Sequence, residues 1–430
     1  MDSEELKRKL LGLWEKTTHG PKEFLGVLFD YYFNTDYIEY EELDGKVVSA
    51  LCGIPYNFGY GSNKLKGLYI IPLSAEEGFR KKGVLSDLLR KFNEKMKEDF
   101  DFTFLVPSNE LLANYFGTEG YFSTFFMHEE RYTPLHDFRN DYLLWLNESD
   151  ERIRQLKIGL MDDLRTEEFS GDSVVKQEII DFIEKSEKNT QASVSLSHTS
   201  KDLDYLLNQS FPQKLNIFVA KDPEGSVAGV AFCHKEELKR IRVEAIYVED
   251  KAAYYSLLDF IKQSFPDHSI SVNATDSKNL TLSLVQYTYA SENPSGGDLD
   301  NTFGNIEIPF NVNKLLQPKG MATLLKLDRI IEFIAATRSD VDFRLHIRDN
   351  DAIRDNVTGD SGELKGEVLS VKNGHFSREM VAYPIKDKSI LNLTQKEVTE
   401  LLLRKNDSSN LIMEAFGIPR LNLQMRLLPC

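Results

Sequence analysis

The sequence has few cysteines, and this shortage limits the chemistry that the chain can carry. Cys52, Cys233 and Cys430 are far apart in 430 residues, and their number is odd. Their spacing matches no metal-binding pattern and no disulfide framework. We therefore expect no metal site and a reducing compartment. The eight histidines form no cluster, so each is expected to be an ordinary polar residue.

Long apolar runs and excess positive charge are also missing. No stretch approaches the roughly 20 apolar residues of a membrane-spanning helix. The N-terminal sequence MDSEELKRKLLGLWEK is charged and amphipathic, without a signal-peptide core. We expect a cytoplasmic protein with no membrane partner. The net charge of −16 argues against a nucleic-acid partner and favours a cationic small molecule.

The apolar content suffices for several folded domains. Hydrophobic residues make up 41% of the chain and aromatic residues 11%, so sizeable cores can form. Residues 3–16 and a segment that starts at Pro21 carry apolar residues at helical spacing. Asp44-Gly45 is a two-residue turn signal between the predicted strands 37–43 and 46–51. We expect an α/β fold with mixed sheets.

The segment between residues 68 and 89 is the most informative stretch. Residues 68–71 predict a buried strand, which Pro72 is expected to end because proline has no N–H for a sheet ladder. The Gly- and Tyr-rich residues 55–62 before it are expected to form a loop. Arg80-x-x-Gly83 then precedes a predicted helix over 84–97. A helix start has free N–H groups and a positive dipole end, which bind phosphate. The plain alternative is a strand–turn–helix with a solvated basic turn.

A second pattern follows directly. Residues 102–106 predict a strand, a short helix follows Pro107, and residues 121–128 predict an aromatic strand. The pattern residues are Asn109, Ala113, Tyr115, Phe116, Gly120 and Tyr121. Together with the Gly83 turn, this pattern resembles the coenzyme A-binding core of the GNAT superfamily of N-acetyltransferases. One departure is Leu85, where the superfamily usually has glycine or alanine; leucine keeps the N–H that a phosphate needs.

The middle segment repeats the order hairpin, strand, turn and helix, over residues 215–232, 241–248 and 252–265. Its turn, from Glu249 to Ala252, has no glycine, and its two carboxylates would repel a pyrophosphate. We interpret it as a degenerate GNAT-like domain without a cofactor. An unrelated α/β segment is the alternative.

The C-terminal segment gives a third pattern. Residues 321–334 predict a helix, residues 341–347 and 366–371 predict strands, and residues 398–403 predict another helix. This order resembles a sterol-carrier-protein-like domain. The three domains together resemble acetyltransferases of the enhanced-intracellular-survival type. We predict a catalytic GNAT domain at 1–145, the degenerate domain at 146–300 and the sterol-carrier-protein-like domain at 301–430, with a surface loop over 291–301.

The resemblance implies transfer of an acetyl group from acetyl-coenzyme A to an amine. It implies cofactor contacts along the acetyl and pantetheine part, around the pyrophosphate and along the coenzyme arm: Leu68, Tyr69 and Ile70; Lys81, Lys82, Gly83, Val84, Leu85 and Ser86; and Phe116 and Gly117. A strand N–H would stabilise the negative charge that grows on the thioester carbonyl.

The same resemblance implies two catalytic groups. Tyr121 would donate a proton to the leaving thiolate, because Phe116 stands at the superfamily's usual acid position and Tyr115 is expected to point elsewhere on its helix. The alternative for Tyr121 is a buried aromatic strand residue. The terminal carboxylate, here of Cys430, would act as the base, although the tail 427–430 departs from the family pattern. Nothing supports the Cys430 thiol as a nucleophile.

The acceptor stays open between an aminoglycoside-like or polyamine-like molecule and a lysine. The family forms ring assemblies, so the resemblance implies a homo-oligomer. A non-enzymatic protein that holds an apolar ligand in the C-terminal domain is the alternative function. A three-domain interaction scaffold has no positive feature in the sequence.

Overall fold

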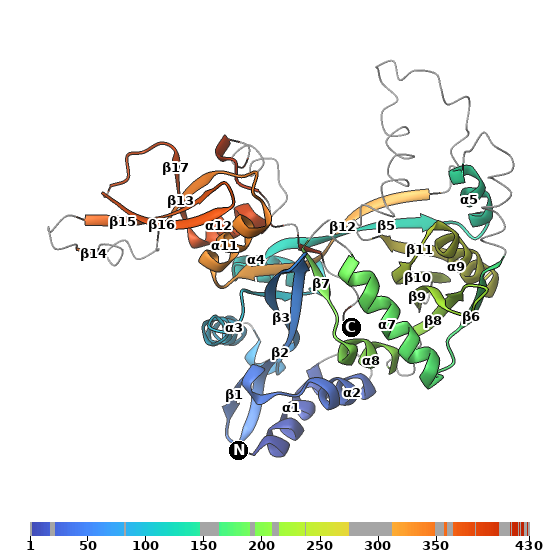
Figure 1. Ribbon diagram of the computed structural model, residues 1–430. Coiled ribbons are helices and arrows are strands. Elements are labelled where there is room, and N and C mark those ends of the chain that lie inside the picture. Colours follow the sequence, from blue (N-terminus) through green and yellow to red (C-terminus); the bar gives the residue numbers. More distant parts are fainter. Residues whose placement is uncertain are drawn as a thin grey trace. The chain divides into compact units, whose positions relative to one another are not determined.

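The computed structural model describes most of the chain (Figure 1). The described residues are 2–17, 22–80, 83–146, 163–189, 194–208, 215–236, 238–274, 312–348, 357–358, 364–382, 384–403, 413, 415–419, 421, 423–424 and 428. The chain divides into two compact units. The first comprises Met1–Phe126, Ser193–Ser197 and Pro318–Met425, and the second comprises Met127–Ala192, His198–Gln317 and Arg426–Cys430. The three-domain division at 145 and 300 stays a prediction, and the loop predicted over 291–301 lies outside the described residues.

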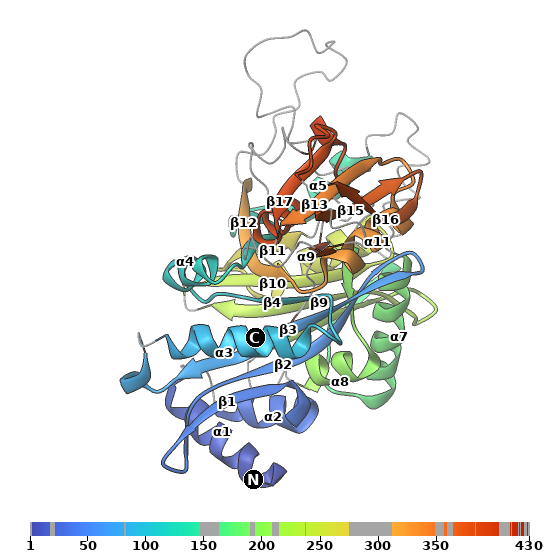
Figure 2. The same cartoon turned by 90° about the vertical axis from the view of Figure 1, so that its left-hand side faces the viewer.

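The first unit is built on a mixed sheet in the order β18-β7-β2-β3-β4-β12, with β1 paired to β2. Its strands are β1 (Ile38–Leu43), β2 (Lys46–Tyr60), β3 (Asn63–Ala75), β4 (Phe102–Leu105), β7 (Val194–Ser197), the later part of β12 (Val312–Leu324) and β18 (Leu423–Gln424). Its helices are α1 (Ser3–Thr17), α2 (Lys22–Tyr32), α3 (Val84–Met96) and α4 (Glu110–Thr118), with 3-10 turns η1 (Thr35–Tyr37) and η2 (Glu77–Phe79). Helix α3 packs along β1, β2 and β3 (Figure 2). The mixed α/β prediction is confirmed.

A second sheet in this unit has the order β14-β15-β13-β17, with β16 paired to β15. Its elements are α11 (Leu327–Thr337), β13 (Phe343–Arg348), β14 (Val357–Thr358), β15 (Leu364–Lys372), β16 (His375–Ala382), β17 (Ile390–Thr394) and α12 (Gln395–Leu403). Helix α11 packs on β15 and β16.

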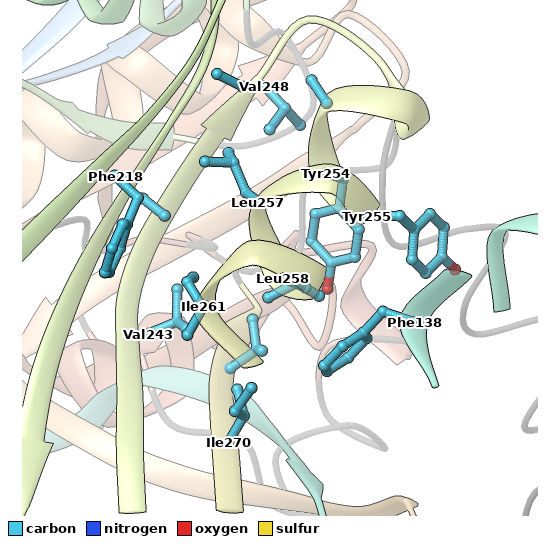
Figure 3. Close-up of a cluster of buried hydrophobic side chains, with 14 of the residues drawn as sticks. Phe138, Phe218, Val243, Val248, Tyr254, Tyr255, Leu257, Leu258, Ile261 and Ile270 are labelled. Atoms are coloured by element: carbon cyan, nitrogen blue, oxygen red, sulfur yellow. The ribbon is translucent and has the colours of Figure 1, made fainter. Parts of the chain in front are cut away.

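The second unit repeats the arrangement of sheet and helices. Its strands are the later part of β5 (Phe122–Tyr132), β6 (Arg165–Glu168), β8 (Leu215–Lys221), β9 (Val227–Glu236), β10 (Arg240–Val248) and β11 (Ser269–Ala274), and its helices are α5 (Phe138–Leu146), α7 (Ser173–Asn189), α8 (Ser200–Asn208) and α9 (Lys251–Ser264). Helix α9 packs on β8, β9 and β10, and its Leu257, Leu258 and Ile261 belong to the buried cluster there, with Tyr254 and Phe138 close to one another (Figure 3). The hairpin, strand and helix predicted for this segment are confirmed.

Local patterns also explain the first hairpin. Asp44 has a φ of +51° and Gly45 a φ of +77°, which is the left-handed backbone that a two-residue hairpin turn requires. The predicted turn is therefore confirmed. In α1, the predicted apolar face, with Leu10 and Trp14 at its centre, is buried. In the described part of the chain, no helix is long and apolar enough to cross a membrane.

Three local predictions are wrong. Residues 55–62 are not a loop, because β2 continues to Tyr60 and only Gly61 and Ser62 turn. The strand pattern is visible there in burial, since Tyr56 and Phe58 are buried while Pro55 and Asn57 are exposed. Pro72 does not end β3, which runs to Ala75. It lies where the β2–β3 register shifts and beyond the β3–β4 pairing, a place where proline costs no ladder hydrogen bond.

The third error concerns the helix predicted over 321–334. Residues 321–324 are the end of β12 and pair antiparallel with β4, from Met321 opposite Leu105 to Leu324 opposite Phe102. The helix begins only at Leu327. Pairing with β4 buries Met321, Ala322 and Leu324, and this tertiary burial outweighs the helical spacing of the apolar residues.

Gly67 shows why β3 needs glycine where it meets β4. A Cβ on Gly67 would lie 2.7 Å from the Phe102 ring and 2.9 Å from the Phe58 ring. We expect Gly67→Ala to lower the free energy of unfolding by about 1–3 kcal/mol through overpacking, measured by chemical denaturation. The matched control is Gly12→Ala in α1, where a Cβ meets nothing within 4 Å. It should raise stability by about 0.5–1 kcal/mol. An equal effect of both changes would contradict this account.

Candidate functional site

The parallel strands β3 and β4 separate at one end. Their pairing runs from Gly67 opposite Phe102 to Tyr69 opposite Phe104. Beyond this point β3 continues to Ala75, whereas β4 ends at Leu105. From Ile70 onward, β3 therefore has backbone groups without a β4 partner. Such a gap between parallel strands can accept hydrogen bonds from an extended, amide-containing ligand.

Helix α3 begins close to this gap in the chain, at a glycine. Gly83 is the N-cap residue, has a φ of +76° and makes no side-chain cap. A Cβ at Gly83 would meet nothing within 4 Å, so there is open space beside the first turn. The amides of Val84, Leu85 and Ser86 in this turn have no intrahelical partner by geometry. Together with the helix dipole, they form a cradle suited to an anion.

Arg80 makes a structural contact through the Nε edge of its guanidinium. Its Nε donates to the carbonyl of Ala75 at 3.1 Å, which ties the basic turn to the end of β3. Lys81 and Lys82 lie outside the described residues, so their predicted roles stay predictions. In the described part of the turn, the candidate anion site rests on the backbone amides at the start of α3.

The corresponding helix of the second unit starts differently. The Asp250 side chain is the N-cap of α9 and accepts a hydrogen bond from the Ala253 amide at 2.8 Å. A carboxylate thus already occupies the position that an anion would take. Lys251 follows it but is 8% exposed and lies over the Tyr254 ring. At the start of α9, the Asp250 side chain therefore takes the Ala253 amide that a phosphate would otherwise bind.

A side-chain network links the first turn of α3 to α4. Ser86 Oγ donates to Glu119 Oε1 at 2.8 Å and lies 3.1 Å from the Tyr115 hydroxyl. Burial raises the pKa of Tyr115. Tyr115 points elsewhere than Phe116, as expected: its hydroxyl reaches α3, whereas Phe116 packs against Tyr121. Sequence spacing could not show this contact, since Ser86 and Tyr115 belong to different helices.

Comparison with models of protein families and with curated proteins gives no match. Solved structures do match over nearly the whole chain. A GCN5-related N-acetyltransferase from Kribbella flavida is 12% identical, covers 99% of this chain and 98% of its own, and has a TM-score of 0.61. A GCN5-related N-acetyltransferase from Anabaena variabilis ATCC 29413 is 12% identical. The match covers 98% of this chain and 97% of that one, with a TM-score of 0.60. Eis1 from Mycobacterium abscessus is 9% identical, with 97% and 91% covered and a TM-score of 0.58. The chain has the fold of these three proteins.

Within this fold, the predicted contact residues of the coenzyme arm are placed as follows. Leu68, Tyr69 and Ile70 are buried in β3 at the point where β4 separates. Phe116 is buried in α4 and packs edge-on against Tyr121 with ring centroids 6.1 Å apart. Gly117 has open space around its Cβ position. The structure brings the strand residues to the gap, and their contacts with a ligand stay predictions.

Tyr121 lies in the core of the first unit. It is 1% exposed, its hydroxyl is 2.9 Å from Thr103 Oγ1, and it accepts from Asn93 Nδ2 at 3.2 Å. Burial raises the pKa of Tyr121 to about 12, so the phenol is protonated at neutral pH. This geometry satisfies the hydroxyl within the protein. Its role as a general acid stays a prediction.

The remaining predicted group, Cys430, lies outside the described residues, as does most of the tail 427–430. The thiols of Cys52 and Cys233 are buried, and burial raises the pKa of both, that of Cys52 to about 12. Buried neutral thiols are poor nucleophiles. Among the described residues, no group of three or more His, Cys, Asp or Glu side chains could hold a metal ion.

Proposed function

We propose that the protein is an acetyl-coenzyme A-dependent N-acetyltransferase. The observation that carries the proposal is the uncapped, glycine-started α3 next to the separated strands β3 and β4. The amides of the first turn of α3 would hold the pyrophosphate, and the free edge of β3 from Ile70 would hold the pantetheine amides. In this arrangement, the helix amides bind the anionic part of the coenzyme, and the strand backbone binds the part that contains amides.

The reaction needs little more from this site than positioning and charge stabilisation. The acceptor ammonium loses a proton, and its nitrogen attacks the thioester carbon to form the C–N bond. The C–S bond then breaks, the nitrogen loses its second proton to become the amide, and the thiolate takes one proton. A free N–H on β3 near Ile70 would donate to the carbonyl oxygen as its negative charge grows. We assign the proton for the thiolate to Tyr121 and the base to the terminal carboxylate of Cys430, as the family resemblance implies.

The acceptor proposed here is a small cationic amine, of aminoglycoside or polyamine type, or a lysine. The net charge of −16 supports this, because an acidic protein attracts cations. The test is an acetylation screen of polyamines, aminoglycosides and lysine peptides with acetyl-coenzyme A, followed by mass spectrometry. Acetylation of at least one class is expected. A folded protein that binds coenzyme A but acetylates none of them would contradict the proposed acceptor class.

We further propose that the C-terminal sheet with α11 and α12 is a sterol-carrier-protein-like domain, as in the enhanced-intracellular-survival type. The fold likeness to Eis1, which covers 97% of this chain, supports this. A pocket of about 380 Å³ on this sheet is lined by Arg344, Lys386 and Asp387 as well as by apolar residues. The homo-oligomer and the cytoplasmic location stay predictions.

The contrast between the starts of α3 and α9 predicts the binding stoichiometry. Because Asp250 caps α9 with a carboxylate, the second unit should not bind the coenzyme pyrophosphate. Isothermal titration with coenzyme A is expected to give one site per chain. Asp250→Asn should leave both stoichiometry and affinity unchanged, because the asparagine side-chain oxygen can still accept from the Ala253 amide. Two equivalent sites per chain would overturn this interpretation of the second unit.

A further inference from the structure

The carboxylate of Glu119 lies at the first turn of α3, where the proposed function puts the coenzyme pyrophosphate. Glu119 is the C-cap residue of α4, and its backbone N–H is bonded to carbonyls of that helix, including those of Tyr115 and Phe116. Its main chain is therefore fixed, and only the side chain is free to change partners. That side chain is held by Ser86 at 2.8 Å, and both residues are partly exposed.

The direction of the hydrogen bonds in this network follows from counting protons. A serine hydroxyl has one proton, and Ser86 gives it to Glu119. The Tyr115 hydroxyl, 3.1 Å from Ser86 Oγ, must then act as the donor to Ser86. The chain of donors runs from Tyr115 through Ser86 to Glu119. In this state Ser86 has no proton left for a phosphate oxygen.

A bound pyrophosphate would need the hydroxyl proton of Ser86, which Glu119 already accepts. Ser86 is the third residue of α3, so its hydroxyl and its amide both belong to the first turn, and a phosphate held there would take both. Glu119 competes for the hydroxyl, and its negative charge would lie a few ångströms from the phosphate charges. Two like charges at such a distance in a partly buried site repel strongly.

We propose that Glu119 is an internal competitor of the coenzyme: it occupies the Ser86 hydroxyl in the free protein and limits the affinity for the pyrophosphate. The inference depends on the proposed coenzyme site and adds a function for a residue that the transfer reaction does not use. Its consequence is faster release of coenzyme A after transfer, because the carboxylate can retake Ser86 when the pyrophosphate leaves.

The test replaces Glu119 with its neutral isostere. Glu119→Gln is expected to lower the Kd for coenzyme A about tenfold, with a slower dissociation rate, measured by isothermal titration and stopped-flow. The affinity for pantetheine, which has no pyrophosphate, should not change. The matched control is Glu110→Gln in the first turn of the same helix, which removes the same charge without touching Ser86 and should leave both affinities unchanged.

The link through Ser86 is tested by a double-mutant cycle. In a Ser86→Ala background, Glu119→Gln should improve coenzyme A binding less than threefold, because the carboxylate is no longer held at the turn. Thermal unfolding checks that all variants are folded. Weaker or unchanged binding by Glu119→Gln, with the wild type binding coenzyme A normally, would overturn the competitor role alone. No coenzyme A binding by the wild type would overturn the proposed function, and this inference with it.

Discussion

Gly83→Asp is expected to weaken coenzyme A binding by at least one to two orders of magnitude in a chain that stays folded. The ideal Cβ of residue 83 points into open space, so the side chain fits, but it brings a carboxylate to the start of α3. That carboxylate would repel the pyrophosphate and could take the amides that bind it. Each tenfold loss corresponds to roughly 1.4 kcal/mol of binding free energy. Calorimetric titration measures the loss.

Gly83→Asn is the control for this change. The φ of +76° disfavours most side chains, but asparagine and aspartate tolerate left-handed backbone better than other residues. The two variants share shape and backbone strain and differ in charge. We expect the asparagine variant to bind at least tenfold more tightly than the aspartate variant. Equal affinities would show that no anion binds near residue 83, and wild-type affinity in both would place the coenzyme elsewhere.

The elements that the sequence predicts correctly have a local cause. The apolar face of α1, the Asp44-Gly45 turn and the glycine start of α3 each depend on residues close in the chain. Helical periodicity, left-handed turn residues and uncapped helix starts are local properties, so the printed sequence contains them. The candidate phosphate cradle at Gly83 was predictable for the same reason.

The elements that were mispredicted depend on contacts between distant segments. Pro72 can lie within β3 because no ladder hydrogen bond needs an N–H at this position. The β2–β3 register shifts near Cys52, opposite Pro72, and the β3–β4 pairing has already ended. Met321 is in a strand because it pairs with β4, which lies more than two hundred residues earlier in the chain. No local pattern contains that information, so the helical spacing of the apolar residues leads to the prediction of a helix.

The same limit applies to the candidate site. The link from Ser86 to Tyr115 and Glu119 joins two helices with β4 between them in the chain. Serine, tyrosine and glutamate at these positions look like ordinary surface residues of amphipathic helices. Only the packing of α3 beside α4 shows that they form one network. Motifs predict where a backbone can hold a ligand, whereas side-chain partners follow from tertiary packing.

Tyr121→Phe separates the two roles that Tyr121 can have. The hydroxyl contacts Asn93 and Thr103 in the core, so its loss should lower the free energy of unfolding by about 1–2 kcal/mol in either case. If Tyr121 is also the acid for the thiolate, kcat should fall by roughly 10²–10⁴ while the Kd for coenzyme A is kept, because the proton is needed only in the transition state.

The matched control is Thr103→Val, which removes a hydrogen-bond partner of the same hydroxyl but leaves the phenol in place. It should lose a similar amount of stability, since a buried hydroxyl loses a partner in both variants. An acid role requires that kcat falls strongly in Tyr121→Phe and little in Thr103→Val. If Tyr121→Phe keeps more than about a third of wild-type turnover, general acid catalysis, which contributes far more, does not come from Tyr121. Its hydroxyl then serves only as a hydrogen-bond partner of Asn93 in α3 and Thr103 in β4.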